Sequence, residues 1–389
     1  MPRPATIMVA VTVAGGAALN LTVLGLAILH PFALNSDFMA FWSFPRFAAA
    51  HPVAQIYNAG ALQPFQAALF PGFGSFYPYL YPPTLLLVIW WLKFCGFRAA
   101  LVLWTAAGIA AFTVAALAFF KTHRLIVLLA LLGSPAALLT GVTGETAFFT
   151  SALLLGGFAA LPRRPILAGI AFGLLTLKPQ LGVLIPFFLL ARGDWAAIIA
   201  AGLTAFALIL ASCLVFPPLL WLTWAHTLPV YQSQYFSGAG LNLNIIVTPA
   251  ANLRALGTPG TLAWLAQLGF SAACVACVML AVRRAGYELA VAVLLTASFL
   301  AVPHAYAYDT ITLTAAMALC LSARTPLWQI LLGCCTYLAP LLLLTPARHY
   351  FLYALPETLL LGCIIALARH KRNGAIIDDE PEHLPATHR

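Results

Sequence analysis

Four acidic residues lie where a carboxylate could do chemistry, in or beside long apolar runs: Asp37, Glu145, Asp309 and Glu357. A carboxylate at membrane depth is costly and is a functional candidate by default. Asp37 follows the first apolar run and is itself followed by an aromatic stretch. A lone carboxylate covered by aromatic rings at a membrane surface is suited to act as a general base.

Three of these acids also have a purely structural interpretation. The residues Asn-Ser-Asp ending at Asp37 would make a good N-cap for a following interfacial helix. Asp309 ends the stretch PHAYAYD, where it could cap the next helix while Tyr306 and Tyr308 form an ordinary interfacial belt. Glu357 follows a proline in the last apolar run, where we expect a packing or capping role.

Lys178 lies near the middle of an apolar run, and Pro179 beside it interrupts the helical hydrogen-bond ladder. An ammonium at that depth needs a partner. Two interpretations stay open at this point. Lys178 could pair with Glu145 as a structural bridge, or it could bind an anionic headgroup, for which a phosphate is the natural choice.

Several motifs are missing from the chain. It has no D-x-D pair that would chelate a divalent ion around a nucleotide diphosphate, and no P-loop, G-x-S-x-G or clustered His and Cys set. This argues against a nucleotide-sugar or ATP-dependent enzyme, and we predict no metal site and no cofactor. One well-placed base with several cations suits group transfer from a lipid-borne phosphate donor.

The composition identifies an integral membrane protein. Hydrophobic residues make up 63% of the chain and charged residues only 7%, against roughly 45 to 50% and about 25% in soluble domains. The net charge of +9 comes from Lys and Arg scattered singly or in pairs between apolar runs. That spacing does not suit nucleic acid and indicates topology signals and contacts with membrane lipids.

The pattern of apolar runs predicts an all-α, polytopic protein of about twelve transmembrane helices in one domain over residues 1–372. A large first extracytoplasmic loop, 31–81, should form short interfacial helices, and a second, 217–256, should lie outside as well. Residues 165–190 should form one full-length span. The tail 373–389 should be disordered and cytoplasmic, as should the N-terminus.

The count of twelve spans assigns each group of basic residues to one side of the membrane. Lys93 and Arg98 would mark a cytoplasmic turn, because a helix from Pro82 or Pro83 to Lys93 is counted as a span. The charges that then lie outside, against the usual bias, are Lys121, Arg124, Arg163 and Arg164.

Several short motifs, in this order and spacing, resemble glycosyltransferase family 87, membrane enzymes of the GT-C fold typified by polyprenyl-phosphate-mannose-dependent mannosyltransferases. The motifs are SDFMAFW at 36–42, Y-x-x-G-x-L at 57–62, YPP at 81–83, GET at 144–146, AGIAFGLLTLKPQ at 168–180 and P-x-x-x-x-YD ending at Asp309. The resemblance covers most of the chain. One departure is Glu145, where the family pattern has Gln after the Gly.

The resemblance implies an inverting hexosyltransferase in a plasma (inner) membrane with its active site on the extracytoplasmic face. Asp37 would take the proton of the acceptor hydroxyl, which belongs to a lipid or glycan, and the leaving group would be a polyprenyl phosphate. Lys178, His304 and Arg46, in that order, are the candidates for the donor phosphate. The remaining expected donor-binding residues are Gln180, Tyr306, Asp309 and Tyr81.

The sequence leaves two other classes of function as alternatives. A lipid-linked glycan flippase or other transporter would need a polar path on both faces, whereas the polar residues here gather on one face. A non-catalytic membrane scaffold would leave Asp37 replaceable.

Overall fold

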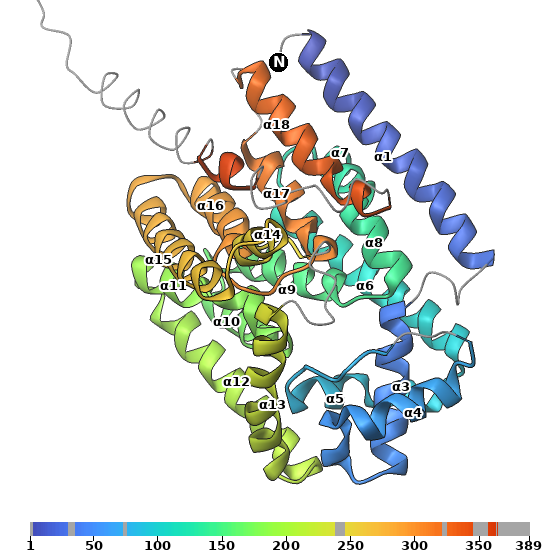
Figure 1. Ribbon diagram of the computed structural model, residues 1–389. Coiled ribbons are helices and arrows are strands. Elements are labelled where there is room, and N and C mark those ends of the chain that lie inside the picture. Colours follow the sequence, from blue (N-terminus) through green and yellow to red (C-terminus); the bar gives the residue numbers. More distant parts are fainter. Residues whose placement is uncertain are drawn as a thin grey trace, which may run out of the picture.

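The computed structural model describes residues 3–29, 36–72, 76–237, 246–320, 325–344, 357–362 and 364 (Figure 1). Within these ranges the protein is built of α-helices and short 3₁₀ turns, and its one extended contact is an antiparallel bridge between Ile246 and Tyr306. The all-α expectation is confirmed. The predicted tail, 373–389, lies outside the described residues.

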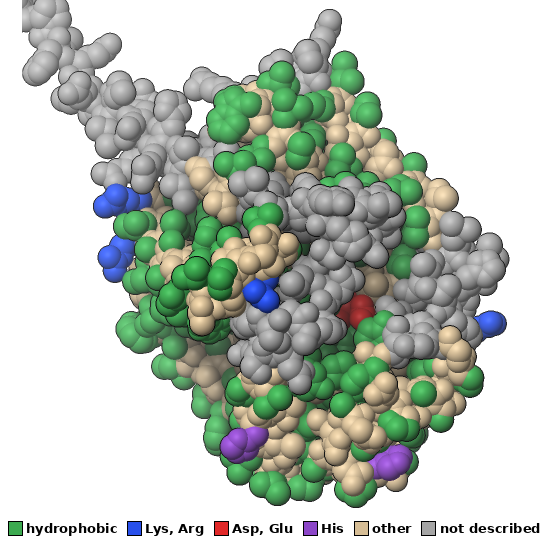
Figure 2. Space-filling view, viewed as in Figure 1, with side chains coloured by type: hydrophobic (Ala, Val, Ile, Leu, Met, Phe, Trp, Pro, Cys, Tyr) green, Lys and Arg blue, Asp and Glu red, His purple; other side chains and the backbone are tan. Residues whose placement is uncertain are grey.

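Four described helices are long and apolar enough to cross a membrane: α1 (Arg3–Leu29) over Thr6–Val23, α6 (Phe97–Phe119), α12 (Trp195–Val215) and α15 (Gly260–Arg284). Hydrophobic side chains are spread over the described part of the face shown in Figure 2, where charged side chains are few. The protein is therefore membrane-embedded, and the number of about twelve spans stays a prediction.

A fifth crossing is possible where α7 (Arg124–Leu132) and α8 (Pro135–Thr143) meet at a bend of 55°. The break has a local cause. Pro135 starts α8, and the Ser134 hydroxyl caps it by accepting a hydrogen bond from the Ala137 N–H at 3.2 Å. Helix α9 (Ala147–Ala160) follows after the turn that holds Glu145.

The first loop folds as expected into short helices, α3 (Ser36–Ala50), a 3₁₀ turn at Val53–Tyr57 and α4 (Ala59–Leu69). These helices lie in the lower part of Figure 1. Their aromatic and aliphatic side chains form a second core, which also takes in the start of α6. Helix α5 (Pro83–Ile89) begins at Pro83, one of the two positions expected, and continues as a 3₁₀ turn over Trp90–Phe94.

The segment Pro83–Phe94 differs from the predicted span. It is roughly 18 Å long, well short of the ~30 Å hydrocarbon core. The buried side chains of this segment belong to the first-loop core, and the Arg46 guanidinium of α3 donates hydrogen bonds to the Leu92, Lys93 and Cys95 carbonyls at 2.9, 3.0 and 2.6 Å. These contacts join the segment to the first loop.

The expectation of one full-length helix over 165–190 is wrong. Helix α10 (Pro165–Leu174) passes into 3₁₀ turns at Leu175–Leu177 and Pro179–Gly182, and α11 (Ile185–Arg192) follows. Lys178 lies at the break with non-helical backbone angles, φ −139° and ψ 70°. Proline disfavours helical backbone in the residue before it and removes an N–H donor, which explains the break.

The two halves of this segment form a hairpin, because both of its ends lie at the same end of the molecule. A Cβ on Gly169 would lie 2.4 Å from the Ala197 carbonyl of α12, and one on Gly173 would lie 2.6 Å from the Ala201 carbonyl. The rising numbers on both helices show that α10 and α12 run parallel. The chain must therefore return along α11 before α12 can start beside α10.

Helix α16 (Tyr287–Leu300) is buried at every residue from Leu289 on and packs against α15 and α17. Several other elements complete the described structure. They are α13 (Leu219–Ser237), α14 (Pro249–Ala255), a 3₁₀ turn at Ala307–Thr310, α17 (Ile311–Cys320), α18 (Leu327–Leu338), a 3₁₀ turn at Ala339–Leu344 and the helical residues 357–362. Of these, α13 lies in the predicted second outer loop and is not among the candidate spans.

Candidate active site

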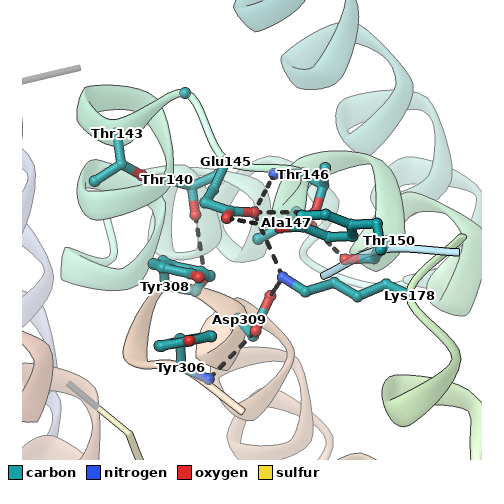
Figure 3. Close-up of polar contacts among 12 residues, drawn as sticks. Thr140, Thr143, Glu145, Thr146, Ala147, Thr150, Lys178, Tyr306, Tyr308 and Asp309 are labelled. Carbon is teal, nitrogen blue, oxygen red and sulfur yellow. Dashed lines mark hydrogen bonds and ion pairs between the residues drawn. The ribbon is translucent and has the colours of Figure 1, made fainter. Parts of the chain in front are cut away.

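A buried ion cluster lies at the apex of the 165–192 hairpin (Figure 3). The Lys178 ammonium is 2.7 Å from Asp309 Oδ1 and 3.5 Å from Glu145 Oε2, and all three side chains are 3% exposed or less. Lys178 Nζ also lies 4.9 Å from the centre of the Tyr308 ring. The predicted pairing with Glu145 is present, but the shorter contact is with Asp309.

Asp309 is both a cap and an ion-pair partner. Its Oδ2 accepts a hydrogen bond from the Tyr306 N–H at 3.3 Å, and the two residues form a capping box for the 3₁₀ turn Ala307–Thr310. The other oxygen faces Lys178. Asp309 therefore caps this turn and also pairs with Lys178, while its predicted part in donor binding stays a prediction.

Glu145 joins three segments of the chain. Its Oε2 accepts from the Thr146 N–H at 2.8 Å and the Thr146 hydroxyl at 3.1 Å, besides pairing with Lys178. Its Oε1 accepts from the Tyr81 hydroxyl at 3.3 Å. Through Tyr81 the exit of the first loop is tied to the cluster.

Asp37 lies in the first turn of α3, beside the cluster, and is only partly buried. Burial raises the pKa of its carboxyl well above the usual range, and the nearby charges of Glu145 and Asp309 raise that pKa further while Lys178 lowers it. The close packing of Phe38 on Gly144, next to Glu145, brings Asp37 near the three buried groups. Four acidic or basic residues from four separate segments therefore meet here.

Gly144 fixes α3 against the cluster. It ends α8 in the left-handed conformation, φ +68°, and a Cβ there would lie 2.5 Å from the Phe38 Cβ. Its carbonyl accepts from the Trp104 indole N–H at 2.9 Å. Because Phe38 follows Asp37, this close approach determines how near the Asp37 carboxyl comes to Glu145.

The close packing at Gly144 predicts that Gly144→Ala lowers both stability and activity. Left-handed backbone and the clash with Phe38 together should cost about 2 to 4 kcal/mol of unfolding free energy. Thermal unfolding of the solubilised protein measures the first effect. Gly141→Ala in α8 is the control, since a Cβ there meets nothing within 4 Å, and equal stability of the two variants would contradict the prediction.

Aromatic rings pack together beside the helix that carries Asp37. The Phe41 ring lies 5.5 Å from that of Tyr81 and 6.0 Å from that of Trp104. Tyr81 in turn packs 6.0 Å from Tyr79. Faces of aromatic rings bind the apolar side of a sugar and keep water from a charged site.

His304 is partly buried in the loop before the 3₁₀ turn, with its ring 4.8 Å from that of Tyr306 and perpendicular to it. Burial lowers its pKa to about 4, and the charge of Lys178 acts in the same direction. The imidazole is therefore neutral at neutral pH. It is a hydrogen-bonding group there and not a cation.

Of the predicted donor-binding residues, Arg46 stands apart from the cluster. Arg46 is nine residues from Asp37 on α3, about 13 Å along the helix. Its guanidinium contacts four backbone carbonyls and lies 3.4 Å from the centre of the Trp42 ring. Gln180 is partly buried in the 3₁₀ turn after Lys178.

No group of three or more His, Cys, Asp or Glu side chains in the described part of the chain is placed to hold a metal ion. The predicted absence of a metal and of a cofactor stays a prediction.

Comparison with known proteins decides the family. The family model of glycosyltransferase family 87 matches residues 79–303, more than half of the chain. The protein belongs to glycosyltransferase family 87. No curated protein and no solved structure matches the chain.

Membership of family 87 implies glycosyltransferase activity. The matched region contains Tyr81, Glu145 and Lys178, whereas Asp37 and Asp309 lie outside it. The structure brings both of these acids to residues inside the match. The cluster thus joins the part of the chain that defines the family to the first loop and to the turn before α17.

Some residues of the site were not predicted from the sequence. The Thr146 hydroxyl and N–H hold Glu145, and Thr140 donates to the Tyr308 carbonyl at 3.1 Å, which fixes the tyrosine under Lys178. Trp104 holds Gly144. Thr146 stands in the GET motif, which gave a signal, but Thr140 and Trp104 lie in apolar runs where nothing distinguishes them.

Proposed function

We propose that this protein transfers a hexose, mannose by family resemblance, from a polyprenyl-phosphate donor to a lipid or glycan acceptor at the extracytoplasmic face of a plasma (inner) membrane. Both chain termini would be cytoplasmic. The observation that carries the proposal is Asp37, a partly exposed carboxyl at the edge of a buried ion cluster, with a raised pKa.

The proposed reaction is a single displacement with inversion. The acceptor oxygen forms a bond to the anomeric carbon as Asp37 takes the hydroxyl proton, and the bond from that carbon to the phosphate oxygen breaks. The electron pair of the broken bond goes to the departing polyprenyl phosphate. A base within hydrogen-bond reach of the attacking hydroxyl typically contributes about 10² to 10⁴ to the rate.

Stabilisation of the leaving phosphate needs donors near the cluster. An ammonium has three N–H donors, and Lys178 directs two of them at Asp309 and Glu145. We propose that the third meets a phosphate oxygen. His304 and Tyr306 add uncharged polar groups around the same cluster, and Gln180 follows Lys178 on the chain. The Tyr81 hydroxyl donates to Glu145 and would have to turn from it to reach the donor. Arg46, whose guanidinium bonds to backbone carbonyls, is not part of this proposal.

The excess of negative charge in the cluster also raises the proton affinity of Asp37, the proposed base. Three carboxylates face one ammonium, so an added negative charge on Asp37 is unfavourable and its proton affinity is high. A base with a raised pKa takes a proton from an alcohol more readily than an ordinary carboxylate. The arrangement therefore favours Asp37 as the proton acceptor.

The raised pKa predicts the pH dependence of transfer. Asp37 must be deprotonated to act, so kcat/KM should fall as the pH drops through the raised pKa, at a pH well above the ~4 of an ordinary aspartate. His304 is neutral above a pH of about 4 and should not contribute this limb. Rates measured between pH about 4.5 and 9 test this, and a flat profile across that range would contradict it.

Donor-dependent transfer in membranes tests the function. Membranes containing the protein, given radiolabelled polyprenyl-phosphate mannose, should incorporate label into lipid or glycan, whereas the nucleotide sugar should give none when synthesis of the lipid-linked donor is blocked. Transfer should persist in a metal chelator. Incorporation from the nucleotide sugar alone would overturn the proposed donor class.

A further inference from the structure

Seven exposed basic side chains are attached to the ends of membrane helices. They are Lys121, Arg124, Arg163, Arg164, Arg192, Arg283 and Arg284, here called the basic collar. In the alternating count of twelve spans, the first four lay outside and the last three inside. The packing of the helices shows instead that all seven lie at one end of the molecule, opposite the ion cluster.

The positions of the first four collar residues follow from helices α6 and α9, which run parallel. Gly108 of α6 packs against Phe148 of α9, and further along both helices the Ala115 Cβ lies 3.6 Å from the position of a Cβ on Gly156. Helix α9 starts directly after Glu145. The carboxyl ends of both helices, with the turns that follow them, therefore point away from the cluster.

Arg192 is placed by the parallel pair α10 and α12. Helix α10 starts directly after Arg164 and runs toward Lys178, so the start of α12 beside it lies at the collar end. Arg192 lies in the turn just before α12.

The contacts of Tyr287 show that Arg283 and Arg284 lie at the same end of the molecule as the other collar residues. Its hydroxyl donates to the Phe158 carbonyl in the last turn of α9, and its ring lies 5.0 Å from the Arg192 guanidinium. Arg283 and Arg284 end α15 just before Tyr287.

The opposite, cluster end has a different charge pattern among the described residues. Arg46 bonds to backbone carbonyls, Lys93 lies 3.8 Å from the centre of the Trp90 ring, and Arg254 donates to the Thr258 carbonyl at 2.7 Å. Among the cations whose exposure the structure describes at this end, only Arg98 is exposed. At the collar end the described acids are Asp194, which pairs with Arg192, and Glu288. The collar end thus carries an excess of exposed positive charge.

Exposed apolar side chains adjoin the collar. Leu125 and Ile126 follow Arg124 with 66% and 67% exposure, and Ile166, 62% exposed, comes two residues after Arg164. Trp195, 61% exposed, starts α12 after Arg192. Cations next to lipid-facing side chains, with a tryptophan at the same level, mark the boundary between hydrocarbon and headgroups.

We propose that the basic collar binds the phosphate headgroups of anionic lipids in the cytoplasmic leaflet. The collar's position at the hydrocarbon boundary favours a lipid over a soluble partner. Each Lys or Arg near such a surface strengthens attraction to anionic lipid, and an excess of these residues in short loops marks the cytoplasmic side. Within the proposed function, this also explains why the cluster end faces outward.

The proposal changes the path of the chain from the alternating count. Pro83–Phe94 stays on the outer side with the first loop, so α6 enters the cytoplasm and the turns at 121–124 and 163–164 lie inside. The 165–192 hairpin then enters the membrane from the cytoplasmic side and returns to that side. Its apex carries Lys178 to the cluster. Neither Pro83–Phe94 nor the 165–192 hairpin now counts as a crossing. Because two crossings are removed, the sides are the same as in the alternating count from α12 onward, and Arg192, Arg283 and Arg284 stay cytoplasmic.

Cysteine labelling tests the sidedness. Arg163→Cys should be labelled by an impermeant maleimide only after the membrane is opened, and Arg98→Cys should be labelled in intact cells, each above the background of the unaltered chain. The alternating count gives the reverse for both. Labelling of Arg163→Cys in intact cells would overturn the proposal without bearing on whether the enzyme transfers sugar.

Lipid retention tests the partner. The variant with Lys121, Arg124, Arg163 and Arg164 all changed to Gln should bind phosphatidylglycerol in phosphatidylcholine nanodiscs at least about tenfold more weakly than the unaltered protein. Arg98→Gln with Lys93→Gln is the control at the other end and should bind it as before. Equal retention by the collar variant would overturn the proposal. If that variant is not recovered folded, Arg163→Gln with Arg164→Gln alone should still show a severalfold loss.

Discussion

Replacing Asp37 by asparagine is expected to lower transfer by about 10² to 10⁴ while leaving the protein folded and inserted. Asparagine keeps the size and polarity of the side chain but cannot take a proton from the acceptor hydroxyl. The fold should tolerate the change, because the pKa of Asp37 is raised by burial and by the charges of Glu145 and Asp309. Removing one of three like charges relieves repulsion in the cluster.

Glu288→Gln is the matched control for this variant. Glu288 is an exposed acid in the first turn of α16, at the end of the molecule away from the cluster. The Glu288→Gln variant should transfer sugar at the wild-type rate. Initial rates at saturating donor and thermal unfolding of both proteins complete the comparison. A rate for Asp37→Asn close to that of the control would reject Asp37 as the base and favour its role as a helix cap.

The sequence predicted those features that depend on local chemistry. Pro83 was expected at a helix start because its missing N–H costs nothing there, and α5 begins at that residue. Lys178 was expected to need a partner because an ammonium cannot stay unpaired at membrane depth. Local rules of this kind require no knowledge of the distant parts of the chain.

Features that depend on distant contacts could not be predicted. Lys178 and Asp309 are 131 residues apart, and nothing in either segment selects the other over Glu145. The hairpin was missed for a different reason. Counting spans by apolar length treats 165–190 as one crossing, although the glycines that pack α10 along α12 and the proline after Lys178 together make the chain turn back.

The second large effect is expected at Lys178. Lys178→Met should lower the unfolding free energy of the detergent-solubilised protein by about 3 to 5 kcal/mol, because it leaves the buried carboxylates of Asp309 and Glu145 without a counter-charge. Thermal or denaturant unfolding measures this loss. Lys93→Met is the control: its ammonium lies over the Trp90 ring on a partly exposed surface, and such a contact is worth about 1 kcal/mol or less.

Two double variants separate the roles that Lys178 could have. Lys178→Met with Asp309→Asn should recover most of the lost stability, and more than Lys178→Met with Glu145→Gln, because the contact to Asp309 is 2.7 Å and that to Glu145 is 3.5 Å. Transfer should stay low in both, since methionine cannot donate to the donor phosphate. Recovery of transfer together with stability would show that Lys178 is only a structural bridge. An unchanged stability in Lys178→Met itself would mean that the carboxylates do not depend on this ammonium.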